Sequence, residues 1–523
     1  MPPLPADFLA GENRELLAPL RWLEPGSLPK GGPPEVDRRS IAEALAVANS
    51  AYGHRGAKRL AEALADPGTA VVVTGQQTGL FGGPLYTLTK AVSATLWAER
   101  LTAAGQPAVA VFWMATEDHD YREVARAGFP EASGLGITTV DLGDDPSPLR
   151  PVGMRAIGPG VADALARFTE SGSGDRFALW AEQLSAWYKP DARFGEAFAR
   201  LLAALLGERC PLLLDAMLPA VKEAERPWLE RVVFGHEELV AAYAERDRRI
   251  AEAEYDLQVQ PQAGSTPLFY LHGQERRRLG IAGDRVTLRG LDSFERGLDW
   301  LESALRENPA VVSPGVLARP AIQDAVLGSF LQVLGPGEMS YMPQAAPLYQ
   351  HLGVDVPWIT LRPQALVLGQ SLIDKAESSG IALDDFVQPA LDLDRLVGGD
   401  RGSELVSGPA GAGTDIAERL AKLEQEALSI DRNLAGPFAK TSQQIQRALT
   451  TFAGKIDKAA AEKNQVARRR AEAVRATCRP GGKLQERVVS TAYFPGKYGD
   501  GFVDSFFAQL DLDPRKLSVI RPE

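Results

Sequence analysis

Four titratable side chains stand in a row directly after an apolar run: Glu117, Asp118, His119 and Asp120. Consecutive charged groups are too costly inside a buried strand, so residues 108–115 are predicted to form a strand that ends at this cluster. Carboxylates around an imidazole could hold a metal ion, bind an ammonium group, or raise the pKa of His119 so that it acts as a general base. A structural role is the alternative, in which Asp118 or Asp120 caps the helix that follows.

A second polar loop follows the apolar residues 71–73 and reads TGQQTGLFGGP. Its glycines would free backbone N–H groups to converge near a helix N-terminus, which is a favourable place for an anion. The glycine spacing matches neither the dinucleotide fingerprint nor a P-loop, so the ligand stays open, and an idle surface turn is the alternative. The candidate binding residues here and at the start of the next helix are Thr74, Gly75, Gln76, Gln77, Gly79, Gly82 and Tyr86.

A third loop, GPGEMSY at 335–341, follows the apolar residues FLQVL. Its glycines would again let a ligand approach the backbone, and the Glu338 carboxylate could accept a hydrogen bond from an amine. A tight turn in which Glu338 caps a helix is the alternative. The candidate binding residues of this loop are Gly335, Gly337 and Glu338. Arg319, at the start of an earlier helix-like stretch, is a further candidate.

Other residues are weaker candidates. Asp215 ends another apolar run and could join the same crevice or be purely structural. The run Arg276, Arg277 and Arg278 could meet a substrate carboxylate or a phosphate, although short arginine runs are commonly solvated surface. His54 lies in a turn between helices and is expected to be a packing or surface residue.

These loops need a scaffold that brings several strand ends together. Apolar runs alternate along the chain with segments of helical periodicity, which is typical of an α/β fold with a doubly wound sheet. Ligands of such sheets bind outside the carboxyl ends of adjacent strands. The loop at Gly75 and the cluster at 117–120 are therefore expected to face one crevice.

The composition excludes several classes of protein. A chain of 523 residues, 45% of them hydrophobic, can bury a large core, and its 57 Lys and Arg against 68 Asp and Glu give a net charge of −11. This acidic balance argues against a nucleic-acid partner. No apolar run reaches the ~18–20 residues of a membrane span, and the N-terminus lacks a signal pattern. Cys210 and Cys478 lack metal-ligand spacing and are expected to be reduced and structural, as in a cytoplasmic protein.

Four segments of the sequence resemble one known family. TGQQTGLFGGPLYTLTKA, VFWMATEDHD, ARPAIQDAVLGSFLQVLGPGEMSY (318–341) and LQERVVSTAYFPGKYG (484–499) are similar to segments of the bacillithiol biosynthesis cysteine-adding enzyme family. The resemblance implies a Rossmann-like core related to class I nucleotidyltransferases and aminoacyl-tRNA synthetases. It also implies two connecting-peptide insertions and a C-terminal helical coiled coil that forms a homodimer. The literal HIGH and KMSKS motifs of those synthetases are absent, so the likeness of fold does not establish adenylate chemistry.

The resemblance and the composition together predict an order of segments along the chain. We expect an N-terminal helical segment at 1–65, the first part of the core at 66–150, a helical insertion at 151–206, a core strand at 207–225, a second insertion with a small strand-rich module at 226–305, the second part of the core at 306–396, a coiled-coil hairpin at 397–480 with a Gly/Ser-rich hinge at 397–412, and a tail at 481–523 that packs on the core.

The function that the resemblance implies is a ligase that adds cysteine to glucosaminyl-malate in the last step of bacillithiol biosynthesis. The cysteine carboxyl group would be activated, most simply by ATP or another nucleotide, and whether a metal ion takes part stays open. Asp118 and His119 are the catalytic candidates, which would bind the incoming ammonium and accept its proton, while Gln76 and Gln77 orient the substrate. A nucleotide-binding scaffold that works through its coiled coil and a sugar nucleotidyltransferase are the alternatives.

Overall fold

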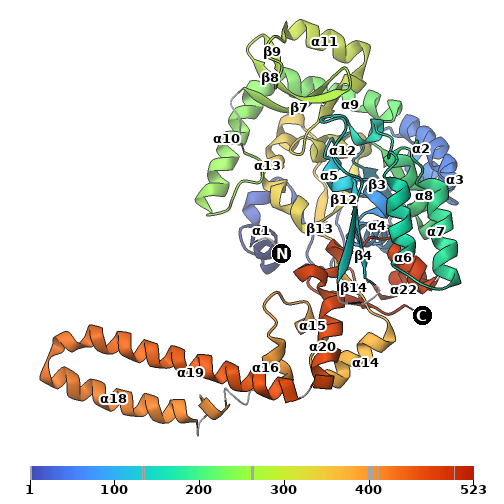
Figure 1. Cartoon of the computed structure of the whole chain (residues 1–523). Coiled ribbons are helices and arrows are strands. Elements are labelled where there is room, and N and C mark those ends of the chain that lie inside the picture. The colour runs from blue at the N-terminus through green and yellow to red at the C-terminus, as the bar shows by residue number, and fades with distance from the viewer. Residues whose placement is uncertain are drawn as a thin grey trace. The chain divides into compact units, whose positions relative to one another are not determined.

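The computed structural model in Figure 1 describes residues 3–131, 134, 136–260, 264–398, 404–406, 408, 411–463, 465–499 and 501–522. The chain divides into two compact units. The larger unit comprises the described residues of Met1–Ala132, Thr138–Val367 and Glu486–Glu523, and the smaller unit comprises those of Ser133–Ile137 and Leu368–Gln485.

A six-stranded parallel sheet forms the centre of the larger unit. In spatial order its strands are β1 (Arg21–Trp22), β13 (Trp358–Leu361), β12 (Ser329–Leu334), β2 (Ala70–Gln76), β3 (Ala108–Met114) and β6 (Leu212–Asp215). The central strands are apolar along nearly their whole length because both faces of the sheet are covered. This sheet confirms the predicted α/β class.

Alternate residues of the central strands enter two separate apolar clusters. Val71 and Val73 of β2 belong to one cluster, and Val72 packs in the other together with Trp97 and Leu101 of α4 (Tyr86–Ala103). Because successive side chains of a strand point to opposite faces, the two clusters mark the two faces of the sheet. The first cluster also takes residues from α2 (Arg39–Ala51), α9 (Pro219–Phe234), α12 (Arg319–Leu327) and α13 (Pro336–Leu352).

The chain leaves β2 toward β3 and β6 on one side, whereas β12 and β13 lie on the other side. The order of the strands therefore changes direction between β2 and β12. A crevice opens at such a point outside the carboxyl ends of the strands. The loops after β2, β3 and β12, which are the three polar loops of the sequence, all end at this edge.

A five-stranded antiparallel sheet lies later in the larger unit. Its spatial order is β10 (Glu295–Gly297), β9 (Arg285–Leu288), β8 (Glu275–Ala282), β7 (Ser265–His272) and β11 (Val312–Pro314). Helix α11 (Leu298–Glu307) packs beside it, and its buried Leu301 and Leu305 enter the same cluster as Leu279 of β8.

The other elements whose residues lie wholly or mainly in the larger unit are α1 (Pro3–Ala10), α3 (Ala57–Ala65), α5 (Tyr121–Val124), α6 (Val161–Glu170), α7 (Asp175–Trp187), α8 (Phe194–Leu206), α10 (His236–Glu252), α21 (Tyr493–Tyr498), α22 (Gly501–Gln509), β4 (Arg126–Pro130), β5 (Ile137–Asp141), β14 (Gln364–Val367) and β15 (Leu517–Ile520).

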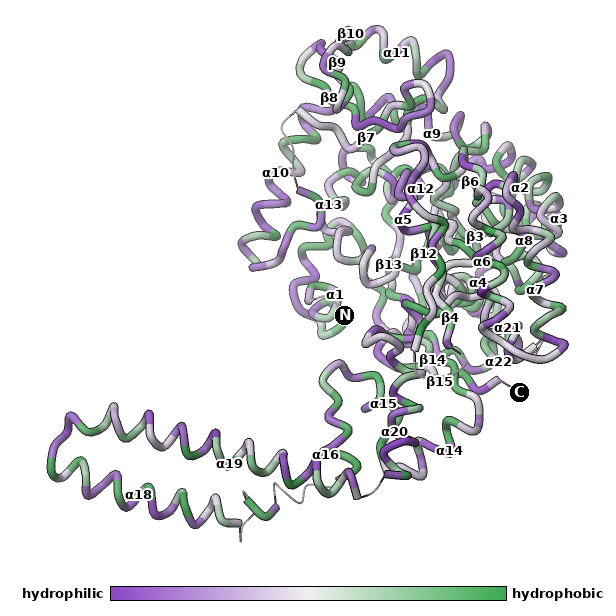
Figure 2. Tube along the Cα trace, in the orientation of Figure 1, coloured by the Kyte–Doolittle hydropathy of each residue, from purple (hydrophilic) through white to green (hydrophobic). Residues whose placement is uncertain are grey.

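The smaller unit is helical. It contains α14 (Gln370–Ser379), α15 (Leu383–Phe386), α16 (Leu393–Gly398), α18 (Ala412–Ile430), α19 (Ala435–Lys463) and α20 (Gln465–Cys478). Helices α18 and α19 run back along each other as the predicted hairpin, and Figure 2 shows polar and apolar positions alternating along both. Residues 399–403, 407, 409 and 410 of the predicted hinge lie outside the described residues.

Gly75 marks the closest approach of β2 to β3. A Cβ atom at this position would lie 2.8 Å from the carbonyl oxygen and 3.2 Å from the Cβ atom of Trp113. We expect Gly75→Ala to push the two strands apart and to lower the free energy of unfolding by about 1–3 kcal/mol. Urea unfolding measures the change.

Gly337→Ala is the matched control, because nothing lies within 4 Å of a Cβ atom there and the position is helical. Alanine is favoured over glycine inside a helix, so this variant should be at least as stable as the parent protein. Equal stability of the Gly75→Ala variant and the parent would contradict the close approach of the strands.

Candidate functional site

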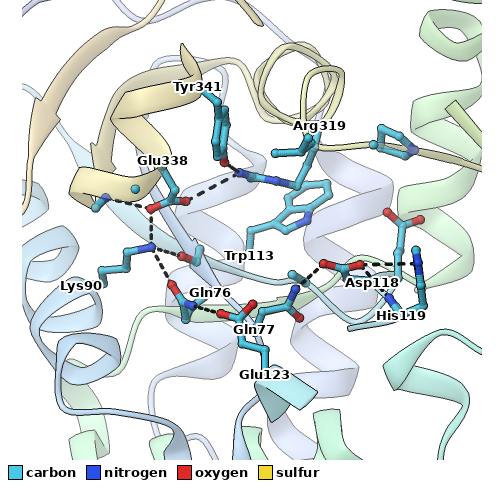
Figure 3. Close-up of a pocket in the computed structure, with 18 of the residues that line it drawn as sticks. Gln76, Gln77, Lys90, Trp113, Asp118, His119, Glu123, Arg319, Glu338 and Tyr341 are labelled. Carbon is cyan, nitrogen blue, oxygen red and sulfur yellow. Dashed lines mark hydrogen bonds and ion pairs between the residues drawn. The ribbon is translucent and has the colours of Figure 1, made fainter. Parts of the chain in front are cut away.

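A cavity of about 540 Å³ opens at the carboxyl edge of the parallel sheet. Figure 3 shows two groups of polar side chains in it, one around Lys90 and Glu338 and one around Asp118 and His119, with Trp113 between them. The structure brings most of the predicted site residues to its wall: Gly75, Gln76, Gln77, Tyr86, Glu117, Asp118, His119, Arg319, Gly335, Gly337 and Glu338.

Four predicted residues do not line the cavity: Thr74, Gly79, Gly82 and Asp120. The hydroxyl of Thr74 donates to the Val333 carbonyl at 2.8 Å and so ties β2 to β12. The two glycines shape the loop, since Gly82 has φ +83° and a Cβ at Gly79 would come within 2.9 Å of the Gly83 Cα. Asp120 accepts a hydrogen bond from the Glu123 N–H at 3.2 Å and caps α5, as the structural alternative held.

Lys90 of α4 joins two of the loops, and the sequence analysis did not identify it. Its buried ammonium donates to the Gly75 carbonyl at 2.7 Å and to Oε1 of Gln76 at 2.8 Å, and it forms an ion pair with Glu338. Burial lowers the pKa of Lys90, and the charge of Glu338 opposes that shift. The available signal was a lone lysine among apolar and small residues in TLTKAVSA.

Glu338 has a second role at the start of α13. Its Oε2 accepts the Gly335 N–H at 2.8 Å, so it caps this helix as the alternative predicted. Its Oε1 lies 3.6 Å from Arg319, whose guanidinium also donates to the Tyr341 hydroxyl at 2.8 Å. The carboxylate therefore stands between the Lys90 ammonium and the Arg319 guanidinium.

Asp118 is held by the loop after β2 and by its own turn. Gln77 donates a hydrogen bond to Oδ2, and the His119 backbone N–H donates to Oδ1 at 2.7 Å. The Arg276 guanidinium lies 3.6 Å from the same Oδ1. The Asp118 carboxylate is only partly buried, which leaves it able to meet a ligand in the cavity.

The expectation that neighbouring carboxylates raise the pKa of His119 is wrong. Burial and the positive charge of Arg276 lower the pKa of His119, and Asp118 and Asp120 only oppose this shift. The sequence placed the carboxylates beside His119, but it could not place Arg276, which lies 157 residues further along the chain.

Glu117 lines the cavity, but its carboxylate is committed to an ion pair with Lys222 of α9. Lys222 also pairs with Glu225 at 2.6 Å, and all three side chains are buried. Burial lowers the pKa of Lys222 and raises that of Glu225. Glu117 therefore anchors the end of β3 to α9.

Glu123 is an acidic residue of the cavity that could not be identified from the sequence. Its Oε1 accepts a hydrogen bond from Nε2 of Gln76 at 3.2 Å. Glu123 is an exposed residue, but partial desolvation of its carboxyl group and the negative charges of Asp120 and Asp118 raise the pKa of Glu123 to about 7. A carboxyl group that titrates near neutral pH can either accept or donate a proton during a reaction.

The weaker candidates divide clearly. Arg276 and Arg278 reach the cavity, whereas Arg277 pairs with Glu275 outside it. Asp215 is not on the wall, since its carboxylate accepts from Thr116 and from the Met217 N–H.

One further expectation of the sequence is confirmed. His54 is the packing residue that was expected, with Nε2 2.9 Å from the Cys210 carbonyl oxygen. Two more arginines that the sequence did not suggest, Arg362 and Arg487, also line the cavity. Arg362 forms two hydrogen bonds of 2.8 Å with Glu486.

The cavity thus holds separate positions for opposite charges. Asp118 and Glu123 can bind an ammonium group, and Arg278, Arg319 and Arg487 can bind carboxylate or phosphate oxygens. In the part of the chain that the structure describes, no group of three or more His, Cys, Asp or Glu side chains is arranged to hold a metal ion. No helix among the described residues is long and apolar enough to cross a membrane.

Two family models match the chain. One is described as the N-terminal Rossmann-like domain of bacillithiol biosynthesis BshC and matches residues 27–363. The other is described as the C-terminal coiled-coil domain of the same family and matches residues 375–520. Together they cover both units of the structure.

Similar proteins from several bacteria carry the name "Putative cysteine ligase BshC". The protein of Salinibacter ruber is 30% identical over 505 residues, which cover 93% of this chain and 89% of the relative. That of Solibacter usitatus is 28% identical, over 86% of this chain and 84% of the relative. That of Geobacillus kaustophilus is 26% identical, over 90% and 88%.

The buried Lys90–Glu338 pair should show strong coupling. We expect Lys90→Met to lower the free energy of unfolding by about 3–5 kcal/mol, because it removes the nearer cation of Glu338 and leaves the Gly75 carbonyl and Oε1 of Gln76 without their donor. Adding Glu338→Gln should recover part of this loss, so that the double variant is more stable than the sum of the single changes. Urea unfolding of the four proteins measures the coupling.

The exposed pair Arg200–Glu196 on α8, with nitrogen and oxygen 2.8 Å apart, is the control for this cycle. Its coupling should stay within about 0.5 kcal/mol. Additive effects at Lys90 and Glu338 would show that the two loops are not joined through this pair.

Glu123 should titrate near neutral pH. In protein labelled with 13C at the glutamate carboxyl, we expect its resonance to move with a midpoint of about 7, and Glu123→Gln identifies that resonance. Asp120→Asn keeps a capping side chain but removes a neighbouring negative charge, so it should lower the midpoint. A midpoint near the ordinary glutamate value of about 4.3 in the parent protein would refute the shift.

Proposed function

This chain belongs to the BshC family of bacillithiol biosynthesis and is a ligase, and from that premise we propose that it joins cysteine to glucosaminyl-malate. The product would be bacillithiol. The bond formed would be an amide between the cysteine carboxyl carbon and the amine nitrogen of the sugar, and one carboxyl oxygen of cysteine would leave with the phosphate-containing group that the nucleotide had attached to it. The observation that carries this proposal is the cavity, in which carboxylates and guanidinium groups face the same space.

The charges of the cavity fit the two ends of such a substrate. A sugar ammonium group would bind near Asp118 and Glu123, while the two carboxylates of the malate portion would bind arginines such as Arg278 and Arg487. The amine must lose protons to become a nucleophile and form the amide. Glu123, with its pKa of about 7, is suited to accept one of them.

The positive charges of the cavity also fit a polyphosphate, although not every cation of the cavity can bind one. Arg319, which lies beside the first turn of α13, would hold phosphate oxygens there, while Arg278 and Arg487 remain for the malate carboxylates. Lys90 is not available for this purpose, since its ammonium already meets three oxygens. A bound nucleoside triphosphate would supply activation of the cysteine carboxyl group.

We also propose that the protein is a homodimer through α18 and α19. The exposed apolar side chains of the smaller unit support this, because Ile430 is 81% exposed and Phe452 is 58% exposed. A second copy of the hairpin would cover them.

The test is mass spectrometry of the purified protein with glucosaminyl-malate and cysteine, with and without ATP and magnesium. We expect bacillithiol only when ATP is present, and its loss in Asp118→Asn and His119→Ala variants that keep the parent circular dichroism spectrum. Sedimentation establishes the oligomeric state of each sample. Unchanged product formation in both variants would refute the site, and product without ATP would refute the nucleotide.

A further inference from the structure

The guanidinium group of Arg276 is held by three contacts besides the one that it makes with His119. Its Nε donates to the Ser313 hydroxyl at 2.9 Å and its Nη2 to the Pro314 carbonyl at 2.7 Å. The group also lies over the ring of Phe269, with 3.9 Å between its central carbon and the ring centre. These contacts leave Nη1 directed at His119, whose Nδ1 is 3.2 Å away.

This contact determines where the proton of His119 lies. A guanidinium has only N–H donors, so a nitrogen that it meets must be an acceptor. In a neutral imidazole one nitrogen accepts and the other carries the proton. With Nδ1 accepting from Arg276, the proton of His119 is on Nε2.

Asp118 offers the competing arrangement. Its Oδ1 lies 3.6 Å from Nδ1 of His119 and would accept a hydrogen bond if that nitrogen carried the proton. This oxygen already accepts the His119 backbone N–H at 2.7 Å, and it also faces Arg276. The shorter contact, from Arg276 to Nδ1, is therefore the one that determines the tautomer of His119.

The other nitrogen of the ring is open. Among the described residues none forms a hydrogen bond with Nε2 of His119, and the residue lines the cavity. The ring of His119 also has an apolar neighbour, because its centre lies 5.7 Å from the centre of the Phe269 ring. No hydrogen bond within the described part of the chain therefore competes with a ligand for Nε2.

We propose that Arg276 is a positioning residue that holds His119 in the neutral tautomer protonated at Nε2, so that His119 gives the cavity a hydrogen-bond donor. In the amide-forming reaction proposed above, on which this role rests, the donor would stabilise negative charge on the carbonyl oxygen of cysteine. The proton of the amine would then go to a carboxylate and not to His119. His119 thereby changes from the general base expected from the sequence to a group that polarises the carbonyl.

The tautomer can be measured without any activity. The chain has five histidines, so uniform 15N labelling of histidine and long-range 1H–15N spectra give five ring patterns, and a His119→Gln variant identifies the one that matters. We expect His119 of the parent protein to show the pattern of the neutral ring protonated at Nε2. A pattern of protonation at Nδ1, or of a charged ring at neutral pH, would overturn the proposal.

Three variants test the part played by Arg276. Arg276→Met should shift His119 toward protonation at Nδ1, whereas Arg276→Lys keeps a donor and should preserve the parent pattern. Arg277→Met is the matched control, because it lies on the same strand and pairs with Glu275 away from the cavity. An unchanged His119 pattern in a folded Arg276→Met variant would overturn the positioning role. Should that variant fail to fold, the parent spectrum still decides the tautomer on which the proposal rests.

Kinetics separates this inference from the proposed function. We expect Arg276→Met to lower kcat by about 100-fold, the usual cost of losing one donor to a developing negative charge, with little change of KM. Arg276→Lys should recover part of kcat. Absence of bacillithiol with the parent protein would refute the proposed function and leave the tautomer assignment standing. A Nδ1-protonated ring in an active protein would do the reverse.

Discussion

The buried ammonium of Lys90 is the contact on which the architecture of the cavity depends. Removing a charged group from water is costly unless hydrogen bonds and an opposite charge replace the lost hydration. The three oxygens that do so come from the last two residues of β2 and from the first turn of α13, which are the two ends of the loops that follow β2 and β12. Because these two loops leave adjacent strands, Lys90 fixes the width of the crevice at the point where the strand order changes direction.

The cost of removing charges from water also explains why some charged groups of the cavity are paired with each other and others are not. Glu117 is neutralised by Lys222, and Arg362 by Glu486, so these buried groups stabilise the frame and offer little to a ligand. Asp118 is more open, with 38% of its side chain exposed. The division between closed pairs and open groups would allow a single cavity to receive both an ammonium and an anion.

Much of the fold and part of the site could be predicted from the sequence. Apolar runs that end in polar loops are local patterns, so they identified β2, β3 and β12 and the loops that carry Gln77 and Asp118. Lys90 gave no such signal, because its role depends on oxygens brought together from residues 75, 76 and 338. The pKa of His119 was misjudged for the same reason, since its nearest cation comes from a different sheet.

The turn after β3 is held from two sides, and this arrangement bears on catalysis. Lys222 of α9 binds Glu117, and Arg276 of β8 contacts His119, so the residues on either side of Asp118 are both fixed by distant elements. A catalytic group gains most when its neighbours cannot rearrange, because the geometry for reaction is then formed before the substrate arrives. The antiparallel sheet therefore does more than cover the core. Its strand β8 supplies the arginine that contacts the ring of His119, which makes this sheet part of the candidate site.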